Sequence, residues 1–423
     1  MDTKDTPKPN RLEWKSFPDQ PGPPMTRIQM TIDNLKHILD HHGFSARYNI
    51  VKKRIETSMS VDLASTDNAD EAVLAEILSV VNLYGLPTGL VPMFTYTLAE
   101  RDSYNPVKDW IEGKAWDGTD RFEALCDTVT VAEDYPVVLK PILLKKWLLS
   151  AVAAAFSDGD FRARGVLSLQ GPQGIGKSSW LKRLVNHPLK HEWVKLDHIM
   201  NVKDKDSKMT AISHWIVEMG ELESSFKHDI GRLKGFLTDG FDKFRRPYAR
   251  ADSNFPRRTV FAATVNDSSF LVDKTGNSRF WTIEVDKLDY LHNIDMQQLF
   301  AQLTEDYWKG KIWWLTKEEE RLLSSVNSQH METSYIHELV FERLDFDKRD
   351  DPNLEHLSAS EVLKQIGIDR PTVTESKDCA ALLREQLGRH KRIRGKNGWR
   401  VAFKALNVTS LHKGPLPAPG EVY

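Results

Sequence analysis

The stretch SLQGPQGIGKSSWLKRL, residues 168–184, has the residue types and spacing of a phosphate-binding loop. It satisfies the pattern GxxxxGK[ST], with a strand-like apolar run before it and a helix-like run after it. In such a loop, glycines let backbone N–H groups face phosphate oxygens, the lysine meets the β- and γ-phosphates, and the serine ligates Mg²⁺. The sequence therefore predicts a site for ATP and Mg²⁺. The predicted nucleotide-binding residues are Gly171, Gly174, Gly176, Lys177, Ser178 and Ser179.

A site that hydrolyses a nucleotide also needs acids at the end of a neighbouring strand, for Mg²⁺ and for polarising water. The stretch HWIVEMGELE supplies Glu218 and Glu221 after an apolar run. By position, Glu218 is the better magnesium ligand beside Ser178, and Glu221 is the better candidate for activating water. Such acids are commonly adjacent in the sequence, but these two are not. The role of each acid therefore stays open. Solvated acids after a buried strand are the alternative interpretation.

Two polar residues at strand ends complete the predicted catalytic set. TVFAATVND ends an apolar run at Asn266, whose amide could orient the attacking water or sense the γ-phosphate. KTGNSRFWTIEV places Arg279 just before another run, where it could reach across a subunit boundary and stabilise transition-state charge. An ordinary surface arginine is the alternative.

A basic segment interleaved with aromatic residues, SSFKHDIGRLKGFLTDGFDKFRRPYARADSNFPRR, lies between the second and third strand-like runs. Cations for phosphates and aromatic rings for bases are typical of grooves for single-stranded nucleic acid. The alternative is a solvated helix followed by a charged loop, with the aromatic rings in the core. The predicted contacts are Lys234, Lys243, Arg245, Arg246 and Tyr248.

The carboxy-terminal region has a different pattern from the rest of the chain. Residues 336–405 read as helix, helix and hairpin, with the hairpin turning at Asn397 and Gly398, which is the order of a winged helix. No acid lies between Glu385 and Glu421, so the hairpin is strongly basic and suited to the backbone of a duplex. A winged helix used only for protein contacts is the alternative. The predicted contacts are Arg392, Arg394 and Lys396.

These motifs must be positioned by several domains, because 423 residues exceed the length of one typical domain of about 150. Short apolar runs alternating with helices predict an α/β core with a mainly parallel sheet. Capping boxes start helices at Thr316 and Ser358. The predicted divisions are a disordered lead-in over 1–24, a small helix-hairpin segment over 25–66, a helical domain over 67–160, the α/β core over 161–325, the winged-helix-like domain over 336–405 and a flexible tail over 406–423.

Composition narrows the classes of protein. Lys plus Arg (58) nearly balance Asp plus Glu (60), so any surface for nucleic acid must be local. Cys126 and Cys379 form no disulfide framework or zinc motif, which favours a reducing, cytoplasmic setting. The longest apolar stretch, residues 142–156, is interrupted by Lys145 and Lys146, so we expect a buried helix and no membrane role.

The order of these motifs resembles the virulence-associated protein E family of phage and mobile-element ATPases, which is related to superfamily 3 helicases and poxvirus-type primase-helicases. The resemblance rests on GPQGIGKS, WIVEMGELE, GRLKGFLTDGFDKFRRPYAR, PRRTVFAATVND and FLVDKTGNSRFW in that order. NPVKDWIEGKAWDGTDRF also resembles the segment that precedes the loop in that family, so the resemblance covers residues 100–325.

The resemblance implies a P-loop NTPase core of the AAA+-like, superfamily 3 helicase type, assembled as a homo-oligomeric ring. We expect a hexamer with ATP between subunits and single-stranded DNA in the central channel. Lys234 matches a segment that forms DNA-contacting loops in related helicases, Asn266 matches the sensor asparagine, and Arg279 matches an arginine that acts in trans. Since residues 1–100 are short and poor in clustered carboxylates, we expect priming to come from a separate primase.

Together these features predict an ATP-dependent DNA helicase or unwinding factor for replication of a phage, plasmid or genomic island. One alternative is an ATP-dependent origin-binding initiator or defence-type NTPase that assembles on nucleic acid without processive unwinding. Another is a non-enzymatic DNA-binding protein in which the nucleotide only controls oligomerisation.

Overall fold

The computed structural model describes twelve stretches of the chain, which divide between two compact units, Met1–Met331 and Glu332–Tyr423. Each unit has its own buried core, centred on Trp147 in the first and on Val362 in the second. The described residues are 11–20, 22, 27–60, 69–159, 161–220, 231–245, 252–266, 271, 277–330, 335–348, 354–393 and 395–404.

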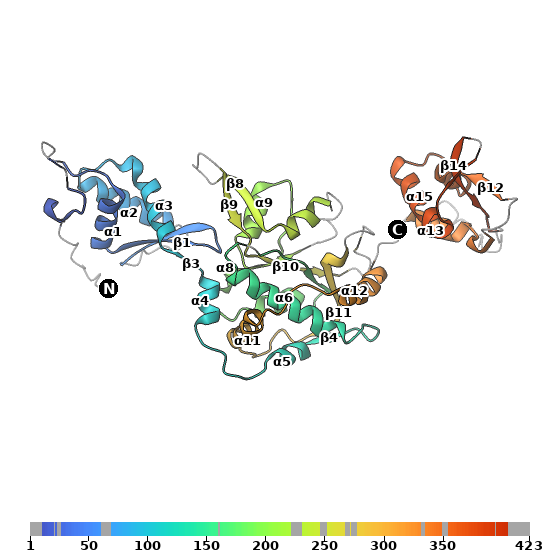
Figure 1. The fold of residues 1–423 in the computed structure, drawn as a ribbon, viewed down its shortest axis with the longest axis horizontal. Coiled ribbons are helices and arrows are strands. Elements are labelled where there is room, and N and C mark those ends of the chain that lie inside the picture. The colour runs from blue at the N-terminus through green and yellow to red at the C-terminus, as the bar shows by residue number, and fades with distance from the viewer. Residues whose placement is uncertain are drawn as a thin grey trace, which may run out of the picture. The chain divides into compact units, whose positions relative to one another are not determined.

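A six-stranded sheet with the order β4-β11-β5-β10-β7-β6 forms the centre of the first unit (Figure 1). Five strands run parallel, and only the edge strand β4 is antiparallel to its neighbour β11. This confirms the prediction of an α/β layer with a mainly parallel sheet. The strands are β4 (Val129–Val131), β5 (Val166–Gln170), β6 (Val194–Lys195), β7 (Ile216–Met219), β10 (Val260–Val265) and β11 (Phe280–Leu288).

Successive residues of the strands belong to two different cores. In β10, Ala262 packs in the cluster that contains α6 and α11, whereas Phe261 packs in the cluster that contains α9 and the hairpin β8–β9. Because both faces of the sheet are covered, the central strands β5, β7 and β10 are mostly apolar on both faces, with single polar residues such as Glu218 and Thr264. The surrounding elements are α4 (Pro106–Glu112), α5 (Phe122–Asp127), α6 (Leu139–Phe156), α7 (Lys177–Arg183), α8 (Lys190–Trp193), α9 (Lys205–Ile212), a helix over 231–238, β8 (Phe241–Arg245), β9 (Asp252–Pro256), the 3-10 helix η3 (Asn277–Arg279), α11 (Met296–Trp308) and α12 (Lys317–Gln329).

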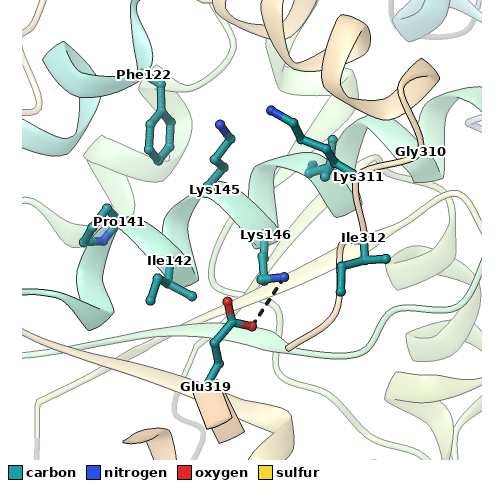
Figure 2. Close-up of a pocket in the computed structure, with 10 residues that line it drawn as sticks. Phe122, Pro141, Ile142, Lys145, Lys146, Gly310, Lys311, Ile312 and Glu319 are labelled. Carbon is teal, nitrogen blue, oxygen red and sulfur yellow. Dashed lines mark ion pairs between the residues drawn. The ribbon is translucent and has the colours of Figure 1, made fainter. Parts of the chain in front are cut away.

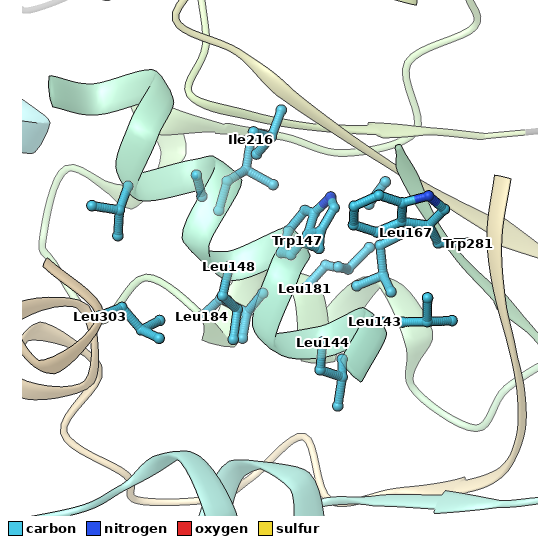
Figure 3. Close-up of a cluster of buried hydrophobic side chains, with 14 of the residues drawn as sticks. Leu143, Leu144, Trp147, Leu148, Leu167, Leu181, Leu184, Ile216, Trp281 and Leu303 are labelled. Carbon is cyan, nitrogen blue, oxygen red and sulfur yellow. The ribbon is translucent and has the colours of Figure 1, made fainter. Parts of the chain in front are cut away.

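The helix α6 lies at the centre of the larger cluster, and 13 of its 18 residues are buried. Trp147 donates from Nε1 to the carbonyl oxygen of Phe261 at 2.7 Å, which fixes the helix to the sheet. Figure 3 shows side chains of α6 beside Leu181 of α7 and Ile216 of β7. The carboxy-terminal part of α6, from Trp147 to Phe156, is almost wholly apolar and is buried all round, whereas Lys145 and Lys146 reach ion-pair partners. Among the described helices, none has both the length and the apolar character needed to cross a bilayer.

The structure divides the stretch predicted as a helical domain, 67–160, differently. From residue 106 onward its helices pack around the central sheet, whereas residues 69–104 pack in a separate, smaller layer. That layer contains a three-stranded sheet of order β2-β1-β3, in which β1 and β2 form the predicted antiparallel hairpin. Its elements are η1 (Trp14–Ser16), α1 (Ile32–His41), β1 (Phe44–Asn49), β2 (Arg54–Met59), α2 (Ala69–Leu83), η2 (Thr88–Leu90), α3 (Val91–Arg101) and β3 (Ser103–Tyr104).

Part of the predicted disordered lead-in is packed against this layer. Phe17 is 2% exposed and lies in the same cluster as Leu35 and Ile77. The side chain of Asn34 donates to the carbonyl oxygen of Asp19 at 3.0 Å. A buried aromatic ring and hydrogen bonds to Asn34 thus hold part of residues 11–20, which the polar composition alone did not reveal, while residues 1–10 lie outside the described stretches.

The turn between β1 and β2 attaches the smaller layer to the core. Val51, 1% exposed, belongs to the cluster of α6. Lys53 has a φ of +57° and donates from Nζ to the carbonyl oxygen of Pro256 at 3.2 Å. The ammonium of Lys52 lies 2.7 Å from the carboxylate of Glu192. This attachment turn, residues 50–53, therefore makes apolar, hydrogen-bonded and ionic contacts at once.

In its described residues, the second unit has three α-helices, a short 3-10 helix and a three-stranded sheet of order β12-β14-β13. The predicted capping box of Ser358 with Glu361 is present, as is the one of Thr316 with Glu319 in the first unit. The elements are α13 (Tyr335–Arg343), η4 (Phe346–Lys348), β12 (Glu355–Leu357), α14 (Ala359–Gln365), α15 (Val373–Leu387), β13 (Lys391–Ile393) and β14 (Lys396–Val401).

The predicted turn of the carboxy-terminal hairpin is wrong. Asn397 and Gly398 lie inside β14, where they pair with residues of β13, and the left-handed backbone of the turn falls at Gly395 (φ +82°). Gly398 has a different reason to be glycine, because a Cβ there would lie 2.4 Å from the carbonyl oxygen of Leu357 on β12. The predicted flexible tail, 406–423, lies outside the residues that the structure describes.

Candidate functional site

The predicted nucleotide-binding loop, residues 171–176, meets the ends of β7 and β10 at one edge of the central sheet. β10 lies between β5 and β7, and its register places Ala262 beside Glu218 and Val265 beside Gln170. Because parallel strands all end at the same edge, residues far apart in the sequence converge there. The edge thus gathers polar groups from three separate motifs.

Two glycines let the loop run close to neighbouring backbone and side chains. A Cβ at Gly171 would lie 2.1 Å from the carbonyl oxygen of Val285 on β11, so no other residue fits without a shift of the loop. Gly176 precedes α7 with a φ of +91°, which L-residues with side chains rarely adopt. Gly174 also has a positive φ, +85°, and is exposed. The glycine pattern in the sequence therefore reflects real backbone requirements.

Lys177 points back over the loop. Its Nζ donates to the carbonyl oxygens of Gly171 at 2.7 Å and Pro172 at 2.8 Å, and to Oδ1 of Asn266 at 2.9 Å. Burial lowers the pKa of this ammonium, and the carboxylate of Glu218 acts in the opposite direction. The structure therefore brings the predicted lysine and the predicted asparagine into direct contact.

Ser178 meets the buried acid of β7. Its Oγ donates to Oε1 of Glu218 at 2.5 Å, and the same oxygen accepts from Oγ1 of Thr264 on β10 at 2.6 Å. Glu218 has no exposed surface. A hydroxyl and a carboxylate oxygen this close are hard donors of the kind that bind Mg²⁺ together with phosphate oxygens. The residues present therefore fit a magnesium site.

Thr264 is a site residue that the sequence interpretation missed. It lies on the same face of the sheet as Glu218, since β10 pairs with β7 and side chains on a strand alternate between faces. The signal was a hydroxyl residue inside the apolar run VFAATV, because a buried polar group needs a partner. Ser179, the remaining predicted loop residue, is exposed at the start of α7, and Glu221 lies outside the described residues.

Arg279 is held at the end of η3, directly before β11. The side chain of Asn327 on α12 donates to the carbonyl oxygens of Asn277 and Phe280, both at 2.9 Å, and accepts from Thr282 at 2.7 Å. These bonds fix the backbone on both sides of the arginine. Its Nε is buried and has no acceptor among the residues that the structure describes.

The basic segment is less exposed than the sequence predicted. Lys234 lies on the helix over 231–238 and is only 7% exposed, rather than on a surface loop. Lys243 is exposed on β8, and so is the aromatic ring of Phe241. Phe244 is buried, as the alternative interpretation expected. The side chain of Arg245 and all of Arg246 and Tyr248 lie outside the described part of the chain.

Arg257, another cation of this segment, has a structural environment. Its guanidinium contacts both carboxylate oxygens of Asp242 at 2.7 and 2.9 Å, and donates to the carbonyl oxygen of Phe236 at 3.1 Å. It also lies over the ring of Phe236, 4.4 Å from the centroid. Since Arg257 is 1% exposed, this buried pair ties the hairpin β8–β9 to the preceding helix.

The second unit keeps its predicted cations at the surface. Arg392 is exposed on β13. Lys396 is also exposed, and its ammonium lies 2.6 Å from the carboxylate of Glu361. That contact is the main reason why the pKa of Glu361 is lowered to about 2. Arg394 falls between the described stretches.

A pocket of about 600 Å³ lies beside α6, apart from the nucleotide-binding loop (Figure 2). Its walls are apolar with three lysines at the rim, but each ammonium is already paired. Lys145 and Lys311 both contact Asp306, and Lys146 contacts Glu319 at 3.4 Å. The paired rim leaves no cation to recognise an anionic ligand, so we assign it no function.

A comparison with known protein families finds a match to this chain. The model of the virulence-associated protein E-like domain matches residues 111–332, which is more than half of the chain. A solved apo structure of the NrS-1 C-terminal region, residues 305–718, is 14% identical, with 89% of this chain and 100% of that chain covered and a TM-score of 0.40. An A-form apo structure of the same region is 14% identical, with 88% and 99% covered and a TM-score of 0.38. No curated protein matches the sequence.

Proposed function

The chain belongs to the virulence-associated protein E-like family, and we propose that it is a P-loop ATPase that acts on DNA in the replication of a phage or other mobile element. The observation that carries the proposal is the convergence of Lys177, Ser178, Glu218 and Asn266 at one edge of a parallel sheet. These side chains come from three separate segments of the chain, and each supplies a group that phosphoryl transfer requires.

The roles follow from the contacts. Lys177 would exchange its bonds to the loop carbonyls for the β- and γ-phosphates of ATP, which are stronger, charged acceptors. Ser178 and Glu218 would hold Mg²⁺, which neutralises phosphate charge. Asn266, in contact with Lys177, is placed to orient the attacking water. Glu221 remains the candidate for activating that water.

We further propose that the active form is a homo-oligomeric ring, with a hexamer as the expectation. The backbone around Arg279 is fixed by Asn327, and its buried Nε has no acceptor among the described residues of the same chain. We infer that this guanidinium binds a phosphate of the nucleotide held by a neighbouring subunit. There it would stabilise the charge of the transition state.

DNA contact would involve both units. In the second unit, α14, α15 and the hairpin β13–β14 have the order of a winged helix, and the exposed Arg392 suits a duplex backbone. In the first unit, the exposed Lys243 and Phe241 on β8 suit a single strand. Lys234, a predicted contact, is buried, and so is Arg257, another cation of the same segment, which leaves fewer cations for a single strand. The alternative function is therefore an ATP-dependent initiator that assembles on DNA without processive unwinding.

ATP hydrolysis by the purified protein, with and without single-stranded DNA, tests the proposal. Lys177→Ala should abolish hydrolysis and leave the fold intact, because the ammonium meets the transferred phosphate. Lys182→Ala is the matched control, since Lys182 lies on the same helix but is exposed. Hydrolysis by Lys177→Ala at the wild-type rate would refute the site.

An unwinding assay on a forked duplex then separates the two candidate functions. Unwinding that depends on ATP and Lys177 supports a helicase. ATP hydrolysis and DNA binding without unwinding support the initiator. DNA binding without measurable turnover, unaffected by Glu218→Gln, would instead indicate a protein in which the nucleotide only controls oligomerisation.

A further inference from the structure

Tyr290 covers one side of the nucleotide-binding loop. It follows β11 and lies against Gly176, where a Cβ would be 2.2 Å from Cδ1 and 2.6 Å from Cε1 of the tyrosine ring. The ring is therefore in van der Waals contact with the last glycine of the loop. Tyr290 nevertheless remains 39% exposed, so part of its aromatic surface faces solvent beside the site proposed for the triphosphate.

The segment that carries Tyr290 is fixed from two directions. The N–H of Asp289 donates to the carbonyl oxygen of Thr128 at 2.8 Å. Arg183, on the helix that follows the loop, donates from Nε to the carbonyl oxygen of His292 at 2.9 Å and from Nη2 to Oδ1 of Asn293 at 3.1 Å. The backbone on both sides of Tyr290 is therefore held in place next to the loop.

A second observation in the same segment concerns the hydrogen-bonding atoms of His292. His292 is 6% exposed, and neither ring nitrogen has a hydrogen-bond partner within the described chain. Burial, and then the nearby Arg183, lower the pKa of this imidazole, so the ring is neutral at neutral pH and keeps one donor and one acceptor. Buried polar groups without partners are rare in native proteins and often mark a place for a ligand or water.

We propose that Tyr290 is the stacking platform for the base of the bound nucleotide. The proposal rests on the function proposed above and specifies the substrate as a nucleoside triphosphate recognised through its aromatic base as well as its phosphates. Every base has a π-face, and the larger face of a purine gains more from stacking. Tyr290 would therefore favour purine nucleotides over pyrimidine nucleotides, and any nucleotide over bare polyphosphate.

Calorimetric titration with Mg²⁺–ATP and with Mg²⁺–tripolyphosphate, which has phosphates but no base, tests this assignment. Tyr290→Ala should weaken ATP binding by about five- to a hundredfold, the range for loss of one base–aromatic stack. Its affinity for tripolyphosphate should stay the same. Tyr290→Phe should bind ATP like the wild type, because it keeps the ring. Trp314→Ala is the control, since Trp314 is a comparably exposed aromatic at 40% outside the site.

The possible failures are distinguishable. If Tyr290→Ala binds ATP as tightly as the wild type, the platform is wrong and the loop assignment stands. If Tyr290→Ala loses ATP and tripolyphosphate equally, the ring supports the loop and does not stack on a base, which also overturns the assignment. If the wild type binds neither compound, or binds both without needing Lys177, the proposed function itself fails and the platform fails with it.

Discussion

Removing one partner of the buried Arg257–Asp242 pair gives the sharpest test of how the hairpin β8–β9 is held. The side chains of the pair are 0% and 6% exposed, so Asp242→Leu leaves a guanidinium without its counter-charge and without access to water. Breaking a buried pair in this way costs about 3–5 kcal/mol. Because Arg257 keeps its bond to the carbonyl oxygen of Phe236, we expect a loss of about 3 kcal/mol in the free energy of unfolding.

A double-mutant cycle separates the pair from its surroundings. Replacing both residues, Asp242→Leu with Arg257→Met, removes the buried charge along with its partner, and such replacements are often neutral or stabilising. The double variant should therefore be more stable than Asp242→Leu alone. The exposed pair Lys309–Glu305, with side chains 62% and 54% exposed, is the control. Glu305→Ala should cost at most about 1 kcal/mol, and less in high salt.

Urea unfolding followed by tryptophan fluorescence, at low and high salt, measures these differences. The effect of Asp242→Leu should not change with salt, since a buried pair is poorly screened. Two results would refute the reasoning. One is a cost for Asp242→Leu no larger than that of Glu305→Ala, and the other is a double variant whose cost equals the sum of the two single variants.

Two further predictions concern the loop and the attachment turn. Gly171→Ala should abolish ATP binding in calorimetry and lower the free energy of unfolding by about 1–3 kcal/mol, because the new Cβ would clash with the carbonyl oxygen of Val285. Unchanged ATP binding would contradict the loop geometry. Burial lowers the pKa of Lys53 to about 7, below its value in the unfolded chain, so above that pH the unfolded chain binds a proton that the folded chain lacks. The free energy of unfolding should therefore rise between about pH 7 and pH 10, by up to about 1.4 kcal/mol per pH unit, and Lys53→Met should flatten that rise in urea unfolding. Equal slopes for both proteins would count against the buried ammonium.

The parts of the molecule that the sequence predicted are those with a local signature. The GxxxxGK[ST] pattern, the apolar strands that end at Glu218 and Asn266, and the capping boxes at Thr316 and Ser358 each depend on neighbours a few residues away. Their spacing can therefore be recognised in the sequence alone. The contact between Lys177 and Asn266 follows once the strands are placed side by side in a parallel sheet.

The missed features depend on contacts between distant residues. Phe17 is buried because it packs against residues of α1 and α2, which the Pro-rich composition of its own segment does not indicate. An arginine such as Arg257 could contact phosphate. Here, however, it forms a buried ion pair with Asp242 of the same hairpin. The carboxy-terminal turn was misplaced because two nearby glycines compete for it, and only the packing of Gly398 against β12 decides between them.

The attachment turn limits how the chain can be divided. The family match begins at residue 111, which invites a shortened protein that starts there. Such a protein would lose Val51 from the core beside the central sheet, the charge that Lys52 places beside Glu192, and the donor that Lys53 gives to Pro256, next to the buried Arg257. The hairpin that carries residues 50–53 therefore contributes to the core of the central sheet, so the segment around it has to be kept when the first unit is produced on its own.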